Sequence, residues 1–374
     1  MFAATEYLKQ QNFKALVTNY DDIVQLVHTF DPKRYGATRN YKSGAVSRLS
    51  PYISRGVIST RFVYEILVER FGDIRPVEKF VQELAWRDYW QRVWQVMNID
   101  EDVKRPQDNI SHFEMPETVI KAQTGIEAVD QSIEELYETG YMHNHMRMYV
   151  ASIVCNIGQS YWKEGARWMY AHLLDADWGS NALSWQWVAG SNSSKKYYAN
   201  QENINKFFES NQRGTFMDHS YESLMSMPVP DILKPEAKLD VKTNLPETNA
   251  NLDAKLPTLV YTHYNLDPNW NSEMIANRVL LLEPEHFERY PLGTNTMDFV
   301  LELSQEIPDL HIYTGTFESL RLLVNDAIYF KEHPFSSHFS GIRESRDWLA
   351  PEVPLEKSFF RYWKELKKTL PEFA

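Results

Sequence analysis

The stretch WKEGARWMYAHLLDADWGSNALSWQW, residues 162–187, decides the fold of the first part of the chain. Its aromatic and aliphatic residues recur at spacings of three and four, which is the period of a helix with a buried face. The carboxylates of Asp175 and Asp177 precede Trp185 and Trp187 in this apolar setting. The stretch therefore predicts helical structure, and it offers two carboxylates as partners for a buried cation.

The same periodicity extends over residues 1–225, which we predict to be a helical domain; Val119–Tyr137, for example, places its apolar residues on one face. Residues 226–256 are polar and rich in proline, which indicates a linker. In residues 257–374, short apolar runs alternate with helical stretches. This alternation predicts a small α/β domain with a parallel sheet, closed by an amphipathic helix over SFFRYWKELKKTL. The predicted fold class is mainly α.

Composition excludes several classes of protein. With 43% hydrophobic and 24% charged residues, the chain is not disordered as a whole. It has no apolar run long enough to span a membrane, and its opening, MFAATEYLKQQNF, lacks the pattern of a signal peptide. We therefore expect a cytoplasmic protein without membrane contact. The single cysteine, Cys155, excludes an internal disulfide and a cysteine-ligated iron–sulfur cluster.

Charge and aromatic content point to specific rather than general contacts. The net charge of −12 argues against indiscriminate nucleic-acid binding. However, the segment from Lys33 to Arg61 holds seven basic residues and no acidic one, so phosphates fit there. Aromatic residues make up 14% of the chain, which is consistent with ring stacking or electron transfer.

Two helical stretches carry candidate functional residues. Glu83, Trp86 and Arg87 share one helix face, either as a binding surface or as a core tryptophan beside a surface ion pair. Asn144, Arg147 and Met148 stand just before a nearly continuous apolar run, where the arginine needs a partner. We expect no metal site, since His143 and His145 diverge on a helix and no third ligand is evident.

Together these residues suit a polar cofactor in an apolar helical bowl, and they resemble the FAD-binding domain of the DNA photolyase and cryptochrome family. YGATRN and VSRLSPYISRGVIS are similar to the tyrosine, arginine and T-S-x-L-S-P-Y phosphate loop of that family, with Val46 in place of the threonine. The resemblance implies FAD as the cofactor. It implies FAD contacts at Tyr35, Ser47, Arg48, Leu49, Ser50, Phe80, Arg87, Arg147, Asp175, Asp177 and Asn181.

ELAWRDYW and MHNHMRM resemble the motifs with which family members bind a pyrimidine dimer. By this resemblance, Glu83 hydrogen-bonds the dimer and Trp86 stacks on it, while Asn144 lies between flavin and lesion. Met148 lines the lesion pocket, where the (6-4) branch of the family has a histidine, so a cyclobutane dimer is favoured. The implied DNA contacts are Arg39, Glu83, Trp86, Asn144 and Trp187.

The opening stretch, residues 162–187, is similar to the motif whose asparagine, here Asn181, approaches flavin N5. Trp185 and Trp162 match the first two members of the family's tryptophan relay, but no tryptophan stands near residue 110 for the outer position. Tyr161, Trp168 and Trp178 remain open as substitutes. The implied catalytic residues are Glu83, Trp86, Asn144, Met148, Trp162, Asn181, Trp185 and Trp187.

Domain order departs from the family, whose members carry an α/β antenna domain before the FAD-binding domain. Here TLVYTHYNLDPNW, residues 258–270, resembles the opening of that antenna domain but follows the helical part. Our hypothesis is a permuted or reduced antenna domain over 257–374. Whether it holds a second, antenna chromophore stays open.

The resemblance implies light-driven repair of cyclobutane pyrimidine dimers in UV-damaged DNA, by electron transfer from reduced, excited FAD. The chain would then be a deoxyribodipyrimidine photolyase. The first alternative is a cryptochrome-type blue-light receptor without repair activity, whose partner is a signalling protein. A second alternative is a flavoprotein that serves only as a binding or structural module.

Overall fold

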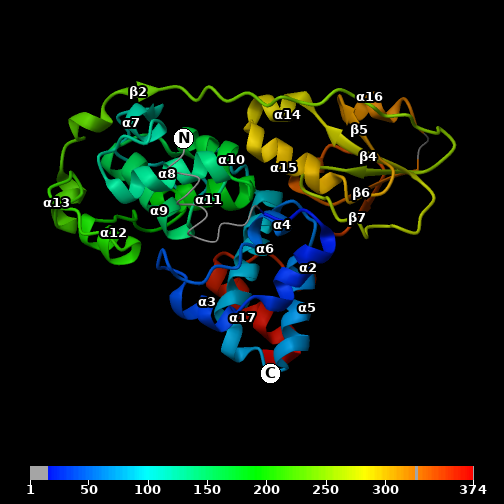
Figure 1. Ribbon diagram of the computed structural model, residues 1–374, viewed down its shortest axis with the longest axis horizontal. Coiled ribbons are helices and arrows are strands. Elements are labelled where there is room, and N and C mark those ends of the chain that lie inside the picture. The colour runs from blue at the N-terminus through cyan, green and yellow to red at the C-terminus, as the bar shows by residue number, and fades with distance from the viewer. Residues whose placement is uncertain (1–15, 325–326, 374) are drawn as a thin grey trace.

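The computed structural model describes residues 16–324 and 327–373. The opening residues, on which the expectation about a signal peptide rests, lie outside this description. Helices occupy the left and the lower part of the molecule, and a parallel sheet forms its right-hand end (Figure 1). The predicted fold class, mainly α with a smaller α/β part, is confirmed.

The helices form two groups, below and at the upper left of Figure 1. The lower group contains α2 (Tyr20–Thr29), α3 (Pro32–Thr38), α4 (Ser50–Ser54), α5 (Thr60–Phe71) and α6 (Glu78–Val96). The upper group contains α7 (Glu117–Ile120), α8 (Glu127–Thr139), α9 (Asn144–Ser152), α10 (Trp162–His172), α11 (Trp178–Ala189), α12 (Gln201–Phe208) and α13 (Tyr221–Ser226). A π-helical turn, η2 (Ile153–Ile157), continues α9.

Local signals explain where these helices begin and end. Asp177 caps α11, since its carboxylate accepts a 2.6 Å hydrogen bond from the backbone N–H of Ser180. Gly190 ends the helix at a φ of 87°. The face predicted over Val119–Tyr137 is not one helix but is divided between α7 and α8. Ala122, with a φ of 53°, and Gly125, with a φ of 77°, interrupt the helical backbone between them.

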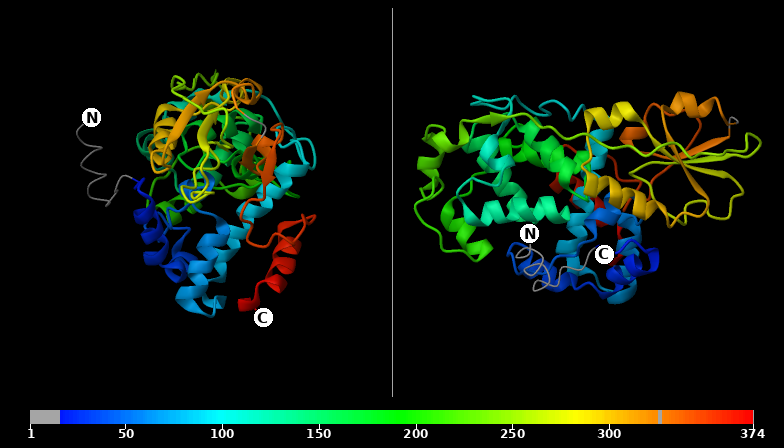
Figure 2. Two further views of the ribbon diagram at one scale, coloured as in Figure 1. Left: turned by 90° about the vertical axis from the view of Figure 1, so that its right-hand side faces the viewer. Right: turned by 45° about the horizontal axis from the view of Figure 1, so that its top comes forward.

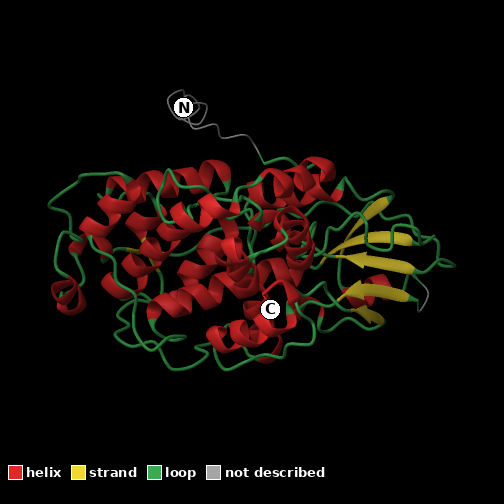
Figure 3. Ribbon diagram, turned by 90° about the horizontal axis from the view of Figure 1, so that it is seen from below, coloured by secondary structure: helices red, strands yellow, loops and turns green. Residues whose placement is uncertain are grey.

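The sheet has five strands in the order β5-β4-β3-β6-β7, and every neighbouring pair is parallel. The strands fan out at one end of the molecule (Figure 3). β3 and β4 are buried along their whole length, as expected of strands covered on both faces. The strands are β3 (Thr258–Tyr261), β4 (Asn277–Leu282), β5 (Leu310–Thr314), β6 (Ile328–Lys331) and β7 (Ile342–Glu344), and the helices between them are α14 (Pro284–Arg289), α15 (Thr294–Ser304) and α16 (Phe317–Arg321).

The polar segment before the sheet contains little regular structure. The short strand β2 (Glu236–Ala237) pairs antiparallel with β1 (Met115–Pro116). From there, residues 238–257 run without helix or strand along the top of the molecule to the sheet (Figure 1). The boundaries of the predicted domains, 1–225 and 257–374, stay predictions.

The last helix, α17 (Phe359–Thr369), does not pack on the sheet with which we grouped it. It returns to the lower helices and lies beside α6, as the views in Figure 2 show. Its buried face includes Phe359, Tyr362 and Trp363. The apolar face of α17 is thus matched by the aromatic face of α6, which the strands do not offer, and Lys367 adds a 3.0 Å ion pair to Glu78.

The sheet joins the helices through close backbone contacts. Leu266 N–H donates to the carbonyl of Arg55 at 2.9 Å, and Gly293 N–H donates to Ala171 at 2.8 Å. Gly56 has a φ of 64°, and a Cβ placed on it would lie 2.4 Å from the carbonyl oxygen of Tyr264. Only glycine meets both requirements without strain.

We expect Gly56→Ala to destabilise the protein more than Gly72→Ala does. Both glycines have a φ of 64°, but Gly72 has no neighbour within 4 Å of an added Cβ. The difference in unfolding free energy should be about 1–3 kcal/mol, the cost of overpacking. Urea denaturation measures it, and equal midpoints for the two variants would contradict the close contact.

Candidate functional site

Polar side chains from four segments gather around Asp175, in the turn between α10 and α11. Its carboxylate accepts two hydrogen bonds from the guanidinium of Arg147 on α9, both 3.1 Å long. Its backbone carbonyl accepts a 3.0 Å bond from Ser54 at the end of α4. The Ser54 hydroxyl in turn accepts a 2.7 Å bond from Arg87 on α6. The structure thus brings together three of the predicted site residues.

The charge of Asp175 is set by these neighbours. Burial by itself would raise the pKa of its carboxyl, because the charged form loses its hydration. The Arg147 guanidinium more than offsets this effect, and Arg87 and the Ser50 hydroxyl add to it, so that the pKa lies below its usual value. Asp175 is therefore a buried anion at neutral pH.

Asp177, two residues after Asp175, is also buried. Besides capping α11, its carboxylate accepts a 2.5 Å hydrogen bond from the amide of Gln91. Nearby, Arg55 is fully buried, and its Nη2 has no hydrogen-bond partner among the described residues. Burial lowers the pKa of Arg55, while Asp175 and Asp177 oppose that shift.

The sequence analysis counted Arg55 only as part of the basic segment, and it did not single out Ser54 or Gln91. A signal for each was present, because Ser54 and Arg55 lie within the quoted stretch VSRLSPYISRGVIS. Gln91 follows Arg87 at the i+4 spacing, which places both on one face of α6.

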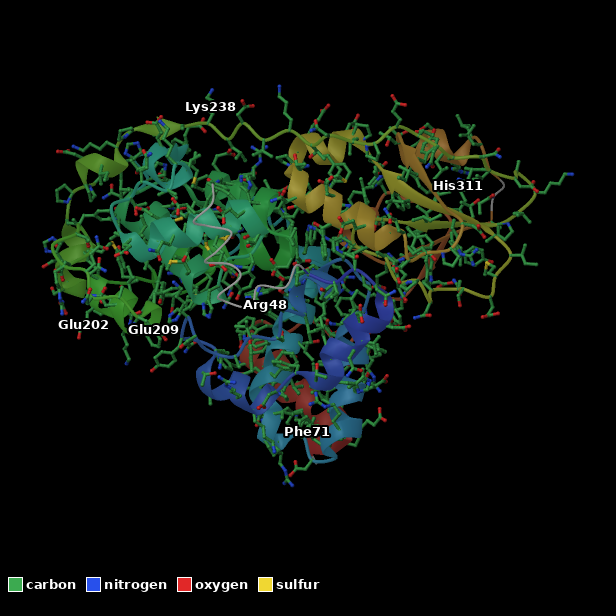
Figure 4. The ribbon with its side chains drawn as sticks, in the orientation of Figure 1. Arg48, Phe71, Glu202, Glu209, Lys238 and His311 are labelled. Atoms are coloured by element: carbon green, nitrogen blue, oxygen red, sulfur yellow. The ribbon has the colours of Figure 1, made fainter. Side chains whose placement is uncertain are left out.

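The predicted phosphate loop borders this group. Ser47 Oγ accepts a 3.3 Å bond from Leu49 N–H, and Arg48 adopts a φ of 54°. Figure 4 labels Arg48 at the junction between the upper and lower helices, and its guanidinium lies 4.5 Å from the ring centroid of Tyr141. A small hollow opens here, lined in part by Arg48, Ser50, Tyr141 and Asp175.

Three other predicted cofactor contacts have mainly packing roles. Leu49 is 1% exposed, and Phe80 is 3% exposed. The Tyr35 ring meets Phe80 edge to face at 5.1 Å, and burial raises the pKa of its phenol. These side chains form the apolar wall beside the loop.

The predicted lesion contacts on α6 have partners within the chain. Glu83 forms a 3.3 Å ion pair with Arg39, and both side chains are about one-third exposed, at 34% and 30%. Burial nevertheless raises the pKa of Glu83, with Arg39 and Lys79 opposing the shift. Both predicted DNA contacts, Arg39 and Glu83, are therefore at the surface and adjacent.

Trp86 stacks face to face on Phe359 of α17, with ring centroids 3.5 Å apart and planes 10° from parallel. Its other close ring is Trp90, at 4.8 Å. The face of Trp86 that Phe359 covers is not free for a base. Sequence reasoning missed this contact, because nothing local links the two residues.

The remaining predicted lesion residues differ in exposure. Asn144 is exposed as the first residue of α9, and Met148 is partly buried. Trp187 is 39% exposed and contacts the ring of Tyr197 at 5.8 Å.

The predicted basic segment is less available to phosphates than its charge suggests. Arg55 lies entirely in the interior. Arg61 donates to Glu65 at 2.7 Å and to the carbonyl of Leu349 at 3.1 Å. Arg55 is therefore not part of a phosphate-binding surface, and the prediction that phosphates fit the segment rests on its other basic residues.

The predicted relay residues lie on the packed helices α10 and α11. Trp185 fits against Gly165, where an added Cβ would lie 2.3 Å from the indole. The indole N–H of Trp162 donates to Asp102 at 2.8 Å. Asn181 donates from its amide to the carbonyl of Ala166 at 2.6 Å, which fixes it to α10.

Comparison with known proteins identifies the family. A family model described as the FAD binding domain of DNA photolyase matches residues 80–267, about half of the chain. The chain belongs to this family. The photolyase family match covers α6, α9, α10 and α11, whereas Tyr35 and the phosphate loop precede it. The expected cofactor, FAD, is thereby confirmed for the family.

Two curated relatives come from both branches of the photolyase family. A deoxyribodipyrimidine photo-lyase of Alkalihalophilus pseudofirmus is 34% identical over 175 residues, 44% of this chain. A cryptochrome DASH of Synechocystis is 30% identical over 219 residues, 54% of this chain. The chain spans only 36% and 44% of those relatives' own lengths.

A bacterial class III photolyase from Agrobacterium tumefaciens is a similar solved structure, with a TM-score of 0.45 and 26% identity. The match covers 50% of this chain and 42% of that one.

In the described residues of the present protein, no helix has both the length and the apolarity needed to cross a membrane.

The donor set around Asp175 fits FAD. Hydroxyls of Ser47 and Ser50 and the guanidinium of Arg48 suit a diphosphate, because each presents donors to its oxygens. The hollow beside them is lined by Arg48 and Ser50, so two of these donors stand at the same opening. The buried Nη2 of Arg55 has no hydrogen-bond partner among the described residues, so it can still donate to a ligand.

We expect Arg147→Met to destabilise the protein by about 3–5 kcal/mol, since it leaves the Asp175 carboxylate buried and uncompensated. In the parent, the depressed pKa of Asp175 adds stability that is present above the unfolded pKa and lost as pH falls through the folded one. In the variant, burial dominates, so the contribution changes sign and stability falls as pH rises.

Urea denaturation from about pH 2 to pH 8, a range that includes the ordinary carboxyl pKa near 4 and the lowered pKa of Asp175, measures this difference. Arg75→Met is the control, because Arg75 forms an exposed pair with Asp73 at 2.9 Å. Parallel stability–pH curves for the parent and Arg147→Met would contradict the role of the buried pair.

Proposed function

We propose that this chain binds FAD beside Asp175 and repairs cyclobutane pyrimidine dimers in DNA with light. The observation that carries the proposal is the convergence of Arg87, Arg147 and Asp175. Glu83 and Trp86 stand on the same helix as Arg87, at the surface of this group. The similarity to deoxyribodipyrimidine photo-lyases supports the repair assignment.

The chemistry that bound FAD supplies is light-driven transfer of one electron to the dimer and its return after ring opening. The chain's own contribution is binding and orientation. Asp175 and Ser54 already hold the guanidiniums of Arg147 and Arg87, so these donors need little rearrangement when a ligand binds. Asn181, fixed to α10, is the proposed neighbour of the reactive ring.

On the DNA side, Glu83 is the proposed hydrogen-bond donor to the dimer. Its raised pKa keeps the carboxyl protonated to a higher pH than that of an ordinary glutamate, which suits donation to a carbonyl oxygen. Arg39 holds Glu83 in the free protein. When DNA binds, Arg39 is freed to contact a phosphate.

A flipped base competes with Phe359 for the face of Trp86. An aromatic pair contributes about 0.5–1.5 kcal/mol beyond its buried area. Stacking of a base on an aromatic side chain contributes about 1–3 kcal/mol. The exchange is therefore balanced or favourable to DNA, and a dimer is cheaper to flip than an intact pair.

A cryptochrome-type receptor is the second candidate. The specific observation in its favour is that Glu83 and Trp86 are both engaged within the chain, by Arg39 and Phe359. The similarity to cryptochrome DASH is compatible with it. In this case the partner is a signalling protein rather than damaged DNA.

Repair of a synthetic thymine dimer in a short oligonucleotide tests the proposal, with reduced, FAD-loaded protein in light and in darkness. We expect dimer loss only in light, and we expect Glu83→Gln to slow it by at least about tenfold, a low value for a positioned acid. Glu65→Gln, on the exposed side of α5, is the matched control. Intact dimer, with FAD bound and reduced by light, would favour the receptor.

Phe359→Ala tests the competition at Trp86. If α17 covers the base-stacking face, the variant should bind dimer DNA about two- to tenfold more tightly, the equivalent of one aromatic pair. Phe360→Ala is the control, because Phe360 is 70% exposed and only touches Trp86 edge-on at 6.5 Å. Fluorescence anisotropy gives the affinities, and equal values for the two variants would show that Phe359 does not compete.

A further inference from the structure

A row of aromatic rings extends from the predicted tryptophan relay toward the sheet. Trp162 on α10 has its ring centroid 6.5 Å from that of Trp178, the first residue of α11. Trp178 lies 5.0 Å from Tyr290, the residue directly after α14. Both indoles are fully buried, whereas Tyr290 is partly exposed. The rings thus form a continuous path from the interior to the surface.

One carboxylate serves two members of this path. Asp100 accepts a 2.8 Å hydrogen bond from the indole N–H of Trp178 and a 2.6 Å bond from the phenol of Tyr290. Asp102, two residues on, accepts the N–H of Trp162. Arg289 forms an ion pair with Asp100 and holds it in place.

This arrangement has a chemical consequence. An indole or phenol that loses an electron becomes far more acidic, so a carboxylate already accepting its hydrogen bond can take the proton without rearrangement. A nearby negative charge also stabilises the indole cation, more strongly in the interior than in water. Burial and the bond to Asp100 raise the pKa of the intact Tyr290 phenol, so it is neutral before oxidation.

We propose that Trp178 and Tyr290 are the outer members of the electron relay, and that Asp100 accepts the proton of Tyr290 when it is oxidised. The inference rests on the FAD photochemistry proposed above. It places the exit of the relay on the sheet-bearing part of the chain, at a residue outside the matched family region.

Tyr290 would lose one electron, which would pass through Trp178 to Trp162 and on toward the predicted inner relay residue, Trp185. Bound FAD, oxidised and excited by light, would supply the electron acceptor. The phenol proton moves to Asp100, leaving a neutral tyrosyl radical and a carboxylic acid. A thiol in solution then donates a hydrogen atom to the radical, becoming a thiyl radical, and Asp100 releases its proton to water.

Two competing exits are built into the same region. Tyr161 lies 5.7 Å from Trp162, beside exposed Phe113. Tyr170 lies 5.7 Å from Trp178, but its hydroxyl shares a 2.9 Å bond with Tyr264, and both are buried. Trp168, which the sequence left open beside Tyr161 and Trp178, instead donates to Tyr137. Tyr290 alone among these tyrosines shares a carboxylate with Trp178 in the described residues.

The first experiment measures FAD photoreduction with a thiol present. Tyr290→Phe removes the proton and keeps the ring, so it should slow the reaction by at least about tenfold, or ~1.4 kcal/mol in the barrier. Asp100→Asn should behave similarly, and both variants should lose the tyrosyl radical signal in electron paramagnetic resonance. Tyr161→Phe and Tyr170→Phe are the matched controls. A parent-like rate and radical yield in Tyr290→Phe would overturn the inference.

A second experiment needs no cofactor. In the FAD-free protein, azide radicals from pulse radiolysis oxidise tryptophan, and absorbance then follows transfer to tyrosine. The parent should form more tyrosyl radical than Tyr290→Phe, and equal yields would overturn the inference. If the parent does not bind FAD, or if its bound FAD is not reduced by light, the proposed function is contradicted. The radiolysis experiment still decides whether an electron passes from Tyr290 to Trp178, because it uses no FAD. Circular dichroism verifies that Asp100→Asn is folded.

Discussion

The bidentate pair between Arg147 and Asp175 is the interaction on which the site depends. Two charges removed from water are costly to bury, and only good geometry with further hydrogen bonds compensates. Here Arg147 also donates to the carbonyl of Met142 at 2.9 Å, and Asp175 accepts from Ser54 through its backbone. The pair therefore fixes α9, the turn before α11 and the end of α4 relative to one another.

This fixed frame explains how a mainly apolar helical unit presents so many donors in its interior. Arg87 reaches the frame through Ser54, and Gln91 reaches it through Asp177. Asp88, three residues before Gln91 on α6, accepts from Thr60 at 2.9 Å and from Leu349 N–H at 2.8 Å. Polar contacts at Arg87, Asp88 and Gln91 thus anchor α6, while Glu83 and Trp86 on the same helix stay partly exposed.

The elements that could be predicted from the sequence are those with a local signal. β3 and β4 have such a signal, because a strand covered on both faces is apolar along its length. β7, whose residues are exposed or partly exposed, does not. The gathering of Arg87, Arg147 and Asp175 was accessible only through the family motifs, since spacing shows what shares a helix face but not which helices meet. The position of α17 had no such signal: its amphipathic pattern shows that it covers an apolar surface, not which one.

The return of α17 to α6 also bears on how the chain is made. The aromatic face of α6, with Trp86, Tyr89 and Trp90, is synthesised before the whole sheet, whereas its cover follows the sheet in the chain. During translation this face has no partner and is a surface for chaperone binding or for aggregation. Folding of the helical unit can then be completed only after the last strand has left the ribosome, so the sheet sets the time at which the rest of the protein matures.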